Sequence, residues 1–245
     1  MKTITKLIYS AFAVAILGIG AVTANGALND LFVSIGGDGS NGGGFIYKYT
    51  PDGVQSIFAS GLSNPRGVAF DRFGNLFVAN STYDDVTQTY QGSVIKITPG
   101  GVQSLFATIQ SDHIFEDLAF DRQGNLFVAS RDQNQDLHGP SSIYKFTPDG
   151  VQSTFGGIPY LIFGLAFDGA GNLFAADAGP PDVPNSAAIY KFTPDGTRSS
   201  LINPRSVTST GRLGWLLIAS VSYSCRYRAP CLRVTTPSSN SLPTA

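Results

Sequence analysis

Two short phrases recur along the chain at a nearly constant interval, and this repetition constrains the fold more than any other feature. The phrase Gly-Asn-Leu-Phe-Val-Ala begins at residues 74 and 124 and returns at residue 171 with Ala in place of Val, so the copies start 50 and 47 residues apart. A second phrase, Thr-Pro-Asp-Gly, begins at residues 50, 147 and 193, and reads Thr-Pro-Gly-Gly at residue 98. Such a period is typical of solenoids and β-propellers.

Each repeat contains four short apolar stretches separated by turn residues. In the second repeat these stretches are residues 67–71, 76–80, 93–98 and 102–107, and a polar loop of residues 81–92 lies between the middle two. The Leu-Phe-Val-Ala stretch lacks polar alternation, as expected of a strand that is buried on both faces. Four strands per repeat describe one blade of a propeller.

The repeats divide the chain into units and predict an all-β fold, an incomplete β-propeller of four to five blades. The units lie within a propeller region of residues 25–202 and span residues 31–58, 66–107, 115–156 and 163–201. The first unit lacks its opening strand.

A change of composition follows the last full unit. No acidic residue lies beyond Asp195, and six arginines lie between Arg198 and Arg233. Residues 203–234 are therefore interpreted as a degenerate repeat, from truncation or a reading-frame change, or as a closing repeat that completes the first blade. We expect residues 235–245, rich in Ser, Thr and Pro, to be disordered.

The beginning of the chain predicts export. Lys2 and Lys6 precede an apolar run at residues 7–21, and small residues follow at 22–24. The run is shorter than the roughly 18 to 20 residues that span a bilayer, so residues 1–24 are interpreted as a secretory signal peptide. We expect a secreted, periplasmic or cell-envelope protein without a membrane span in the mature chain. The net charge of −1 gives no reason to expect a nucleic-acid partner.

Three sets of residues carry a family resemblance that covers residues 31–202. They are the run from Pro65 to Asp71, the Gly-Asn-Leu-Phe strands and the Ile-Tyr-Lys-Phe-Thr-Pro-Asp-Gly turns. With these phrases the chain resembles the NHL-repeat propellers and, more loosely, the SMP-30/gluconolactonase-like and virginiamycin B lyase-like propellers. The resemblance implies the fold far more specifically than any activity.

Residues that recur in every repeat are interpreted as structural. The first set is an aspartate before a turn, where a carboxylate can accept backbone N–H bonds; the second is a lysine in the third strand of each repeat. These residues are Asp71, Asp121 and Asp168, and Lys48, Lys96, Lys145 and Lys191.

Positions at which the repeats differ are more informative about function. The residue after the second apolar stretch is Ser34, Asn80, Ser130 or Asp177, and the residue two before the first stretch is Arg66, Glu116 or Phe163. In gluconolactonase-like propellers metal ligands come from such strand ends. The resemblance implies that Glu116, Asn80 and Asp177 could bind Ca²⁺ or Mg²⁺. The alternative is an ordinary polar lining of a wet channel.

The loops at residues 81–92, 131–140 and 177–186 are equivalent in the repeats and differ completely in sequence, so they are expected to crowd one face. Expected contacts of a protein or carbohydrate ligand on this face are Tyr83, Asp84, Asp85, Tyr90, Arg131, Asp132 and Asp182. No Gly-x-Ser-x-Gly or His-Glu-x-x-His motif is present.

The sequence therefore predicts a binding or interaction scaffold without catalytic residues or a cofactor. One alternative is a metal-dependent lactonase-like or lyase-like enzyme. Another is a fragment of a larger propeller without a function of its own.

Overall fold

The computed structural model describes residues 14–15, 30–37, 42–109, 112–132, 139–177, 179 and 187–202. All regular structure in these residues is β-strand. The prediction of a signal peptide falls outside the described residues except for residues 14–15. The predictions for Asp182 and for residues 203–234 and 235–245 also fall outside them.

The described residues form four antiparallel sheets of four strands, each built from one sequence repeat. The first sheet contains β1 (Val14–Ala15), β2 (Leu31–Ile35), β3 (Gly44–Tyr49) and β4 (Gln55–Leu62). The second contains β5 (Pro65–Phe70), β6 (Leu76–Asp84), β7 (Thr89–Ile97) and β8 (Gln103–Ile109). The third contains β9 (His113–Phe120), β10 (Leu126–Asp132), β11 (Ser141–Phe146) and β12 (Gln152–Ile158), and the fourth contains β13 (Ile162–Phe167), β14 (Leu173–Asp177), β15 (Ala188–Phe192) and β16 (Arg198–Ile202).

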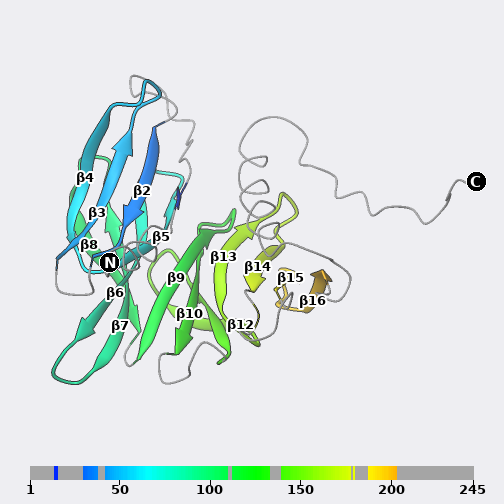
Figure 1. Cartoon of the computed structure of the whole chain (residues 1–245). Helices are drawn as coiled ribbons and strands as arrows, with labels where there is room; N and C mark the ends of the chain where they lie inside the picture. Colours follow the sequence, from blue (N-terminus) through cyan, green and yellow to red (C-terminus); the bar gives the residue numbers. More distant parts are fainter. Residues whose placement is uncertain are drawn as a thin grey trace, which may run out of the picture.

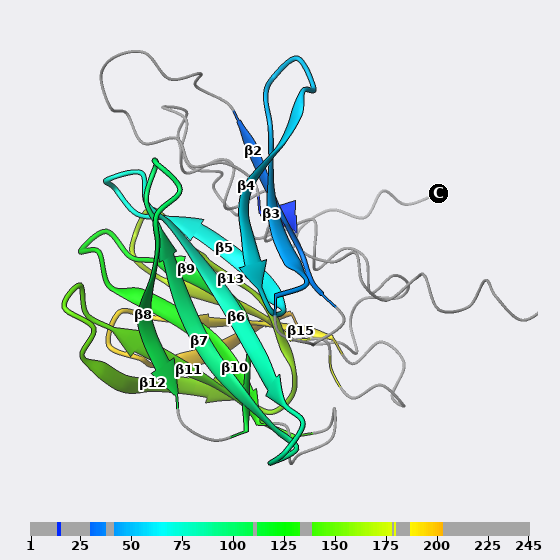
Figure 2. The ribbon, with the colours of Figure 1, turned by 90° about the vertical axis from the view of Figure 1, so that its left-hand side faces the viewer.

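The sheets follow one another in sequence order as the blades of a propeller. Figure 1 shows them side by side, from the first sheet in blue to the fourth in yellow, and Figure 2 shows the first sheet at one end of the series. The first strands of the second, third and fourth sheets contact one another, β5 against β9 and β9 against β13, so they are the inner strands. The prediction of an incomplete β-propeller is confirmed, with four blades in the described residues.

The inner position of the first blade is filled by a strand that the repeat pattern did not predict. β1 pairs antiparallel with β2, with Val14 opposite Val33 and Ala15 opposite Phe32. The two residues carry none of the repeated phrases, which explains why the first unit reads as lacking its opening strand. Among the residues that the structure describes, no helix combines the length and apolar character needed to cross a membrane.

The repeated aspartate closes the turn between the first two strands of a blade. Asp121 Oδ1 accepts the N–H groups of Gln123 and Asn125, and its Oδ2 accepts the side-chain amide of Asn125 at 2.7 Å. Gly124 has a φ of 87°, which glycine adopts without strain. Asp71 and Asp168 make the same bonds in their repeats, so the structural interpretation of this set is confirmed.

Phenylalanine triads hold neighbouring blades together. Phe127 of β10 packs edge-on against Phe155 of β12 in its own blade and against Phe167 of β13 in the next, with both ring centroids 4.9 Å away. The outer-strand phenylalanine is reached through a β-bulge, which turns its side chain into the joint. Equivalent triads join the other blades: Phe32, Phe58 and Phe70, and Phe77, Phe106 and Phe120.

The repeated lysines cover these rings from outside. The ammonium groups of Lys96 and Lys145 lie 5.7 and 5.5 Å from the ring centroids of Phe77 and Phe127. Lys48 instead forms an ion pair with Asp30 at 2.6 Å. These contacts confirm that Lys48, Lys96 and Lys145 are snorkelling or ion-paired blade residues.

Candidate functional site

Buried polar side chains gather at one end of the blades. At this end the second strand of each blade finishes and the third begins, and it therefore carries the predicted variable loops; we call it the loop face. The buried polar residues are Ser34, Ser63, Asn80, Ser81, Ser93, Glu116, Ser130, Ser141 and Asp177. The aspartate turns lie at the opposite end. A polar interior at one end of a rigid scaffold marks this face as the place to search for a site.

The inner strands β5, β9 and β13 each contain a β-bulge near the loop face, at a position where the three blades carry different side chains. The pairing of β9 with β10 skips Glu116, and the pairing of β13 with β14 skips Phe163. In the pairing of β5 with β6, Arg66 and Gly67 together lie opposite the single residue Ala79. A bulge redirects the side chain of the extra residue and is frequent beside active sites. The repeat position occupied by Arg66, Glu116 or Phe163 therefore coincides with a β-bulge in each inner strand.

Glu116 is held by two arginines. Its Oε2 accepts a hydrogen bond from Arg66 Nη1, and its Oε1 accepts one from Arg131 Nε at 2.7 Å. The glutamate side chain is 5% exposed, whereas those of Arg66 and Arg131 are 30% and 20% exposed. The three side chains come from β5, β9 and β10, so the cluster ties two blades together at the ends of their inner strands.

Asn80, at the equivalent place in the second blade, is used in building the connection between blades. Its Oδ1 accepts the backbone N–H groups of Ser63 and Asn64, each at 3.1 Å, and its Nδ2 donates to Ser93 Oγ at 3.3 Å. The amide oxygen therefore already binds two donors.

Asp177 has one carboxylate oxygen without a partner. Its Oδ1 accepts the N–H of Gly179 at 2.7 Å, but among the described residues its buried Oδ2 has no hydrogen-bond partner. Burial raises the pKa of Asp177 to about 6, against the opposing effect of the Gly179 amide.

The structure gives the three predicted metal ligands different surroundings. Among the described residues no three His, Cys, Asp or Glu side chains lie close enough to hold an ion. Two guanidinium groups on Glu116 would also repel a cation. Of these three residues, only Asp177 has a buried oxygen without a hydrogen-bond partner in the described part of the chain.

Asp117 is an acidic residue beside Glu116 that the sequence did not single out. Its Oδ2 accepts the N–H of Leu165 on β13 at 2.7 Å. On the other side Gly67 of β5 approaches so closely that a Cβ there would lie 2.2 Å from Asp117 Oδ1. Burial raises the pKa of Asp117 to about 7, opposed by the amides of Leu165 and Leu118 and aided by the charge of Glu116. One carboxyl group thus joins three inner strands.

Four of the residues predicted to contact a ligand lie in the β6–β7 hairpin: Tyr83, Asp84, Asp85 and Tyr90. Figure 1 shows this hairpin reaching beyond the neighbouring sheets. Tyr83 and Tyr90 pair across its strands with ring centroids 4.8 Å apart, and Asp84 Oδ1 caps the tip by accepting the N–H groups of Val86 and Thr87. Asp85 is exposed beside it. Arg131 and Asp132 are the last residues of β10 in the next blade, and Arg131 Nε donates a hydrogen bond to Glu116.

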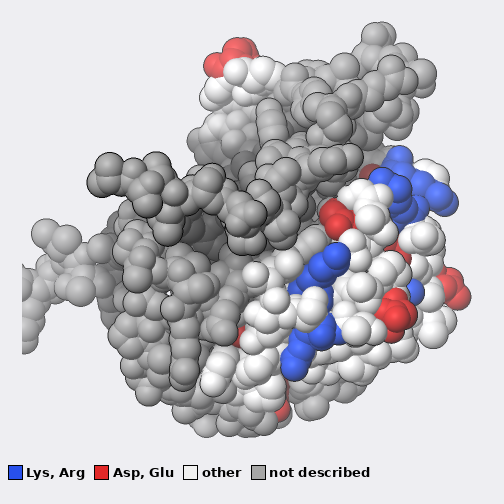
Figure 3. Space-filling model, turned by 90° about the vertical axis from the view of Figure 1, so that its right-hand side faces the viewer, with Lys and Arg blue, Asp and Glu red and all other residues white. Residues whose placement is uncertain are grey.

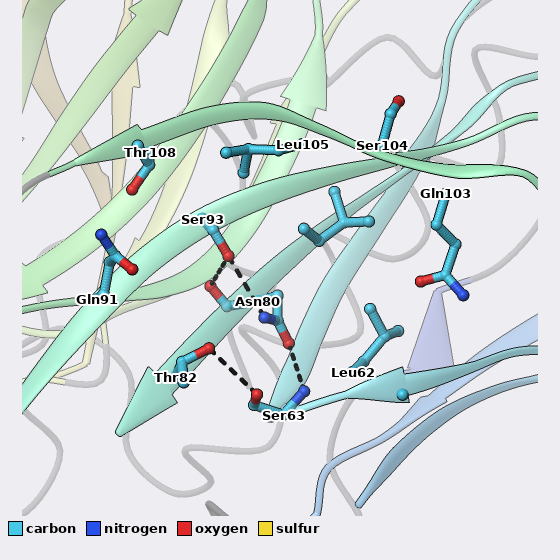
Figure 4. Close-up of a pocket in the computed structure, with 12 residues that line it drawn as sticks. Leu62, Ser63, Asn80, Thr82, Gln91, Ser93, Gln103, Ser104, Leu105 and Thr108 are labelled. Atoms are coloured by element: carbon cyan, nitrogen blue, oxygen red, sulfur yellow. Dashed lines mark hydrogen bonds between the residues drawn. The ribbon is translucent and has the colours of Figure 1, made fainter. Parts of the chain in front are cut away.

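A pocket of about 380 Å³ lies beside this hairpin, on the side of the second blade that faces the first. Figure 4 shows Gln91 and Thr108 at one end, Gln103 at the other, and Asn80 and Ser93 between them. The side chains around it are hydroxyls, amides and a few aliphatic groups, and none is charged: Leu62, Ser63, Asn80, Thr82, Gln91, Ser93, Ile95, Gln103, Ser104, Leu105 and Thr108.

The polar groups of the pocket are held in fixed directions. Thr82 donates to Ser63 Oγ at 3.1 Å, Ser93 is bonded to Asn80, and Gln103 Nε2 donates to the carbonyl of Ser60 in the first blade at 3.0 Å. Among the described residues Gln91 and Ser104 make no side-chain hydrogen bond, and Leu105 is 62% exposed. The pocket combines free donors and acceptors with an apolar surface.

The pocket residues escaped the sequence analysis because they form a site only through packing between blades. Gln91, Gln103 and Ser104 are unremarkable polar residues of strands, and no motif connects them. The distribution of charged residues does not indicate a site either. Figure 3 shows Lys and Arg interspersed with Asp and Glu over the described residues of one face.

Comparison with known proteins agrees with the architecture. The chain matches no protein-family model and no curated protein sequence. Among solved structures, it is similar to a gluconolactonase from Xanthomonas campestris (18% identity, 60% of this chain and 50% of that one, TM-score 0.43) and to the virginiamycin B lyase of Staphylococcus aureus (14%, 71% and 52%, 0.45). It is also similar to an exo-β-1,3-galactanase from Phanerochaete chrysosporium (14%, 78% and 49%, 0.54).

These likenesses concern the fold alone, because all three identities are low. The chain spans about half the length of each of the three structures. The predicted similarity to gluconolactonase and virginiamycin B lyase propellers is nevertheless confirmed at the level of structure, whereas the NHL resemblance rests on the sequence phrases.

Proposed function

We propose that this chain is an exported binding protein that recognises an uncharged, hydroxyl-rich ligand, a carbohydrate, in the pocket between its first two blades. The pocket between the first two blades carries the proposal, because its polar lining contains no charged side chain. Burying a charged ligand there without a partner would be costly, whereas sugar hydroxyls can both donate and accept hydrogen bonds. The volume lies within the range of small-molecule sites.

The surroundings of the pocket support recognition rather than chemistry. Gln91 provides an unengaged polar group, and Leu105 and Ile95 provide an apolar surface for the C–H face of a sugar ring. The Tyr83–Tyr90 pair lies on the same hairpin and adds a rigid aromatic surface. Export is inferred from Lys2, Lys6 and the apolar run at residues 7–21, which together resemble a signal peptide. Removal of this peptide on export would also remove β1 from the first blade.

Glycan-array binding of the purified protein, with neutral and acidic glycans compared, tests this proposal. We expect neutral glycans to bind, and Gln91→Ala to weaken binding about tenfold, the loss of about one hydrogen bond. The matched control is Gln123→Ala, an exposed glutamine in the turn at the opposite end of the third blade. Absence of neutral-glycan binding, or equal binding by both variants, would overturn the proposal.

The alternative is a metal-dependent lactonase-like or lyase-like enzyme, which the free oxygen of Asp177 favours. Such a site would require Glu116 to exchange its two arginines for a cation. Thermal unfolding with EDTA and then with Ca²⁺ or Mg²⁺ separates the two functions, because a ligand that binds only the folded state raises the midpoint. We expect no shift; an increase that Asp177→Ala abolishes would favour the enzyme.

A further inference from the structure

We propose a second site on the loop face, where Arg66 and Arg131 bind a small oxyanion through the guanidinium groups that Glu116 leaves unsaturated. The ligand class is a carboxylate or a phosphate, whose paired oxygens match the fork of a guanidinium group. This site differs in place and in charge from the uncharged pocket between the first two blades.

The hydrogen bonds of the cluster leave most donors unused. Each guanidinium has five N–H donors. In the described residues, Arg66 uses Nη1 and Arg131 uses Nε, both on Glu116, while Arg66 Nε is buried without a partner. The other N–H groups of the two guanidinium groups have no protein acceptor among the described residues, so an oxyanion can accept hydrogen bonds from those that reach solvent.

The charges of the cluster also favour an anion. Among the described residues, two guanidinium groups form ion pairs with one carboxylate, so one positive charge remains uncompensated there. Asp117 lies next to Glu116, but its carboxyl group faces Leu165 and Gly67, and burial raises its pKa to about 7. Asp132 follows Arg131 in β10, and successive side chains of a strand point to opposite faces.

The cluster is reachable and partly fixed in position. The side chains of Arg66 and Arg131 are 30% and 20% exposed, and Glu116 is 5% exposed behind them. Ser34 Oγ donates a hydrogen bond to the carbonyl oxygen of Arg66, which anchors the backbone of β5 to the first blade. Glu116 therefore orients the two arginines, and their outer donors remain available to solvent.

Isothermal titration of the full chain with inorganic phosphate and with acetate, at constant ionic strength, tests the site. We expect phosphate or acetate to bind the wild type, and Arg131→Lys to weaken binding about tenfold because lysine keeps the charge but loses the fork. The matched control is Arg122→Lys, which changes an exposed arginine in a turn at the opposite end of the blade and should bind as the wild type does.

Glu116→Gln is a second variant for the same titration. It removes the internal competitor of the anion, so we expect tighter phosphate binding, whereas any cation site that used this glutamate would be lost. Circular dichroism confirms that each variant is folded before titration. Absence of binding in both the wild type and folded Glu116→Gln would show that the arginines only brace the structure. Equal affinity of wild type and Arg131→Lys would also overturn the proposal.

Discussion

Asp117 is the residue whose ionisation should affect stability most. The usual pKa of its carboxyl group is 3.8, and burial raises it to about 7 in the folded chain. Between these values the unfolded chain has released the proton while the folded chain retains it. The free energy of unfolding therefore falls as pH rises through this window, by at most about 1.4 kcal/mol per pH unit, and the loss is complete above pH of about 7.

Asp117→Asn should remove this loss, because asparagine cannot ionise and still offers an oxygen to the Leu165 amide. Urea unfolding at about pH 4 and about pH 7.5 measures the effect. We expect the stability of the variant relative to wild type to increase with pH. Ionisation of Asp177 also lowers the free energy of unfolding as pH rises, but Asp177 is present in both proteins and its effect cancels in the comparison. Asp85→Asn, which changes an exposed carboxylate, is the control, and a parallel pH dependence of wild type and Asp117→Asn would contradict the expectation.

Among the elements, the aspartate turn between the first two strands determines the geometry of each blade. Asp121→Ala removes three hydrogen bonds from the turn that places Gly124 at positive φ. We expect a loss of about 2 kcal/mol in the free energy of unfolding. Gln123→Ala in the same turn should change it by no more than about 0.5 kcal/mol. Urea titration compares the two, and similar losses would show that backbone conformation alone holds the turn.

The β6–β7 hairpin permits a test of cross-strand coupling. Tyr83 and Tyr90 are opposite each other and their rings are tilted by 49°. A double-mutant cycle with alanine should give a coupling of about 0.5–1.5 kcal/mol, as aromatic pairs do. Thr82 and Gln91 are opposite each other at the next position and provide the matched pair. A coupling no larger than theirs would show that the tyrosines do not stabilise the hairpin together.

The period of the sequence was sufficient to predict the blades, because each strand and turn depends on residues close together in the chain. The Asp71, Asp121 and Asp168 turns are of this local kind. Glu116 was identified by its position, but its partners were not. Arg66 comes from the preceding blade and Arg131 from the adjacent strand, and no pattern connects them with it. The pocket residues and the pairing of β1 also depend on contacts between distant segments.

In the molecule as a whole, the joints between blades repeat as faithfully as the blades. Three phenylalanine triads join the four sheets, and each uses a ring from the following blade. In the fourth blade Phe174 has the position of Phe127, and Leu201 replaces the outer-strand phenylalanine. Leu201 is 50% exposed, and in the described residues no inner strand follows to contribute the third ring. The fourth joint is therefore incomplete in this part of the chain.

Phe127→Ala and Phe174→Ala compare a complete joint with this incomplete one. Removing Phe127 leaves a cavity between two blades and should cost about 3–5 kcal/mol of unfolding free energy. Removing Phe174 should cost less by at least about 1 kcal/mol, because among the described residues its ring has no counterpart of the two edge-on partners of Phe127. Urea unfolding at several protein concentrations measures both. Equal costs would mean that residues beyond Ile202 complete the joint, whereas equal costs that depend on protein concentration would mean that a second copy of the chain does so.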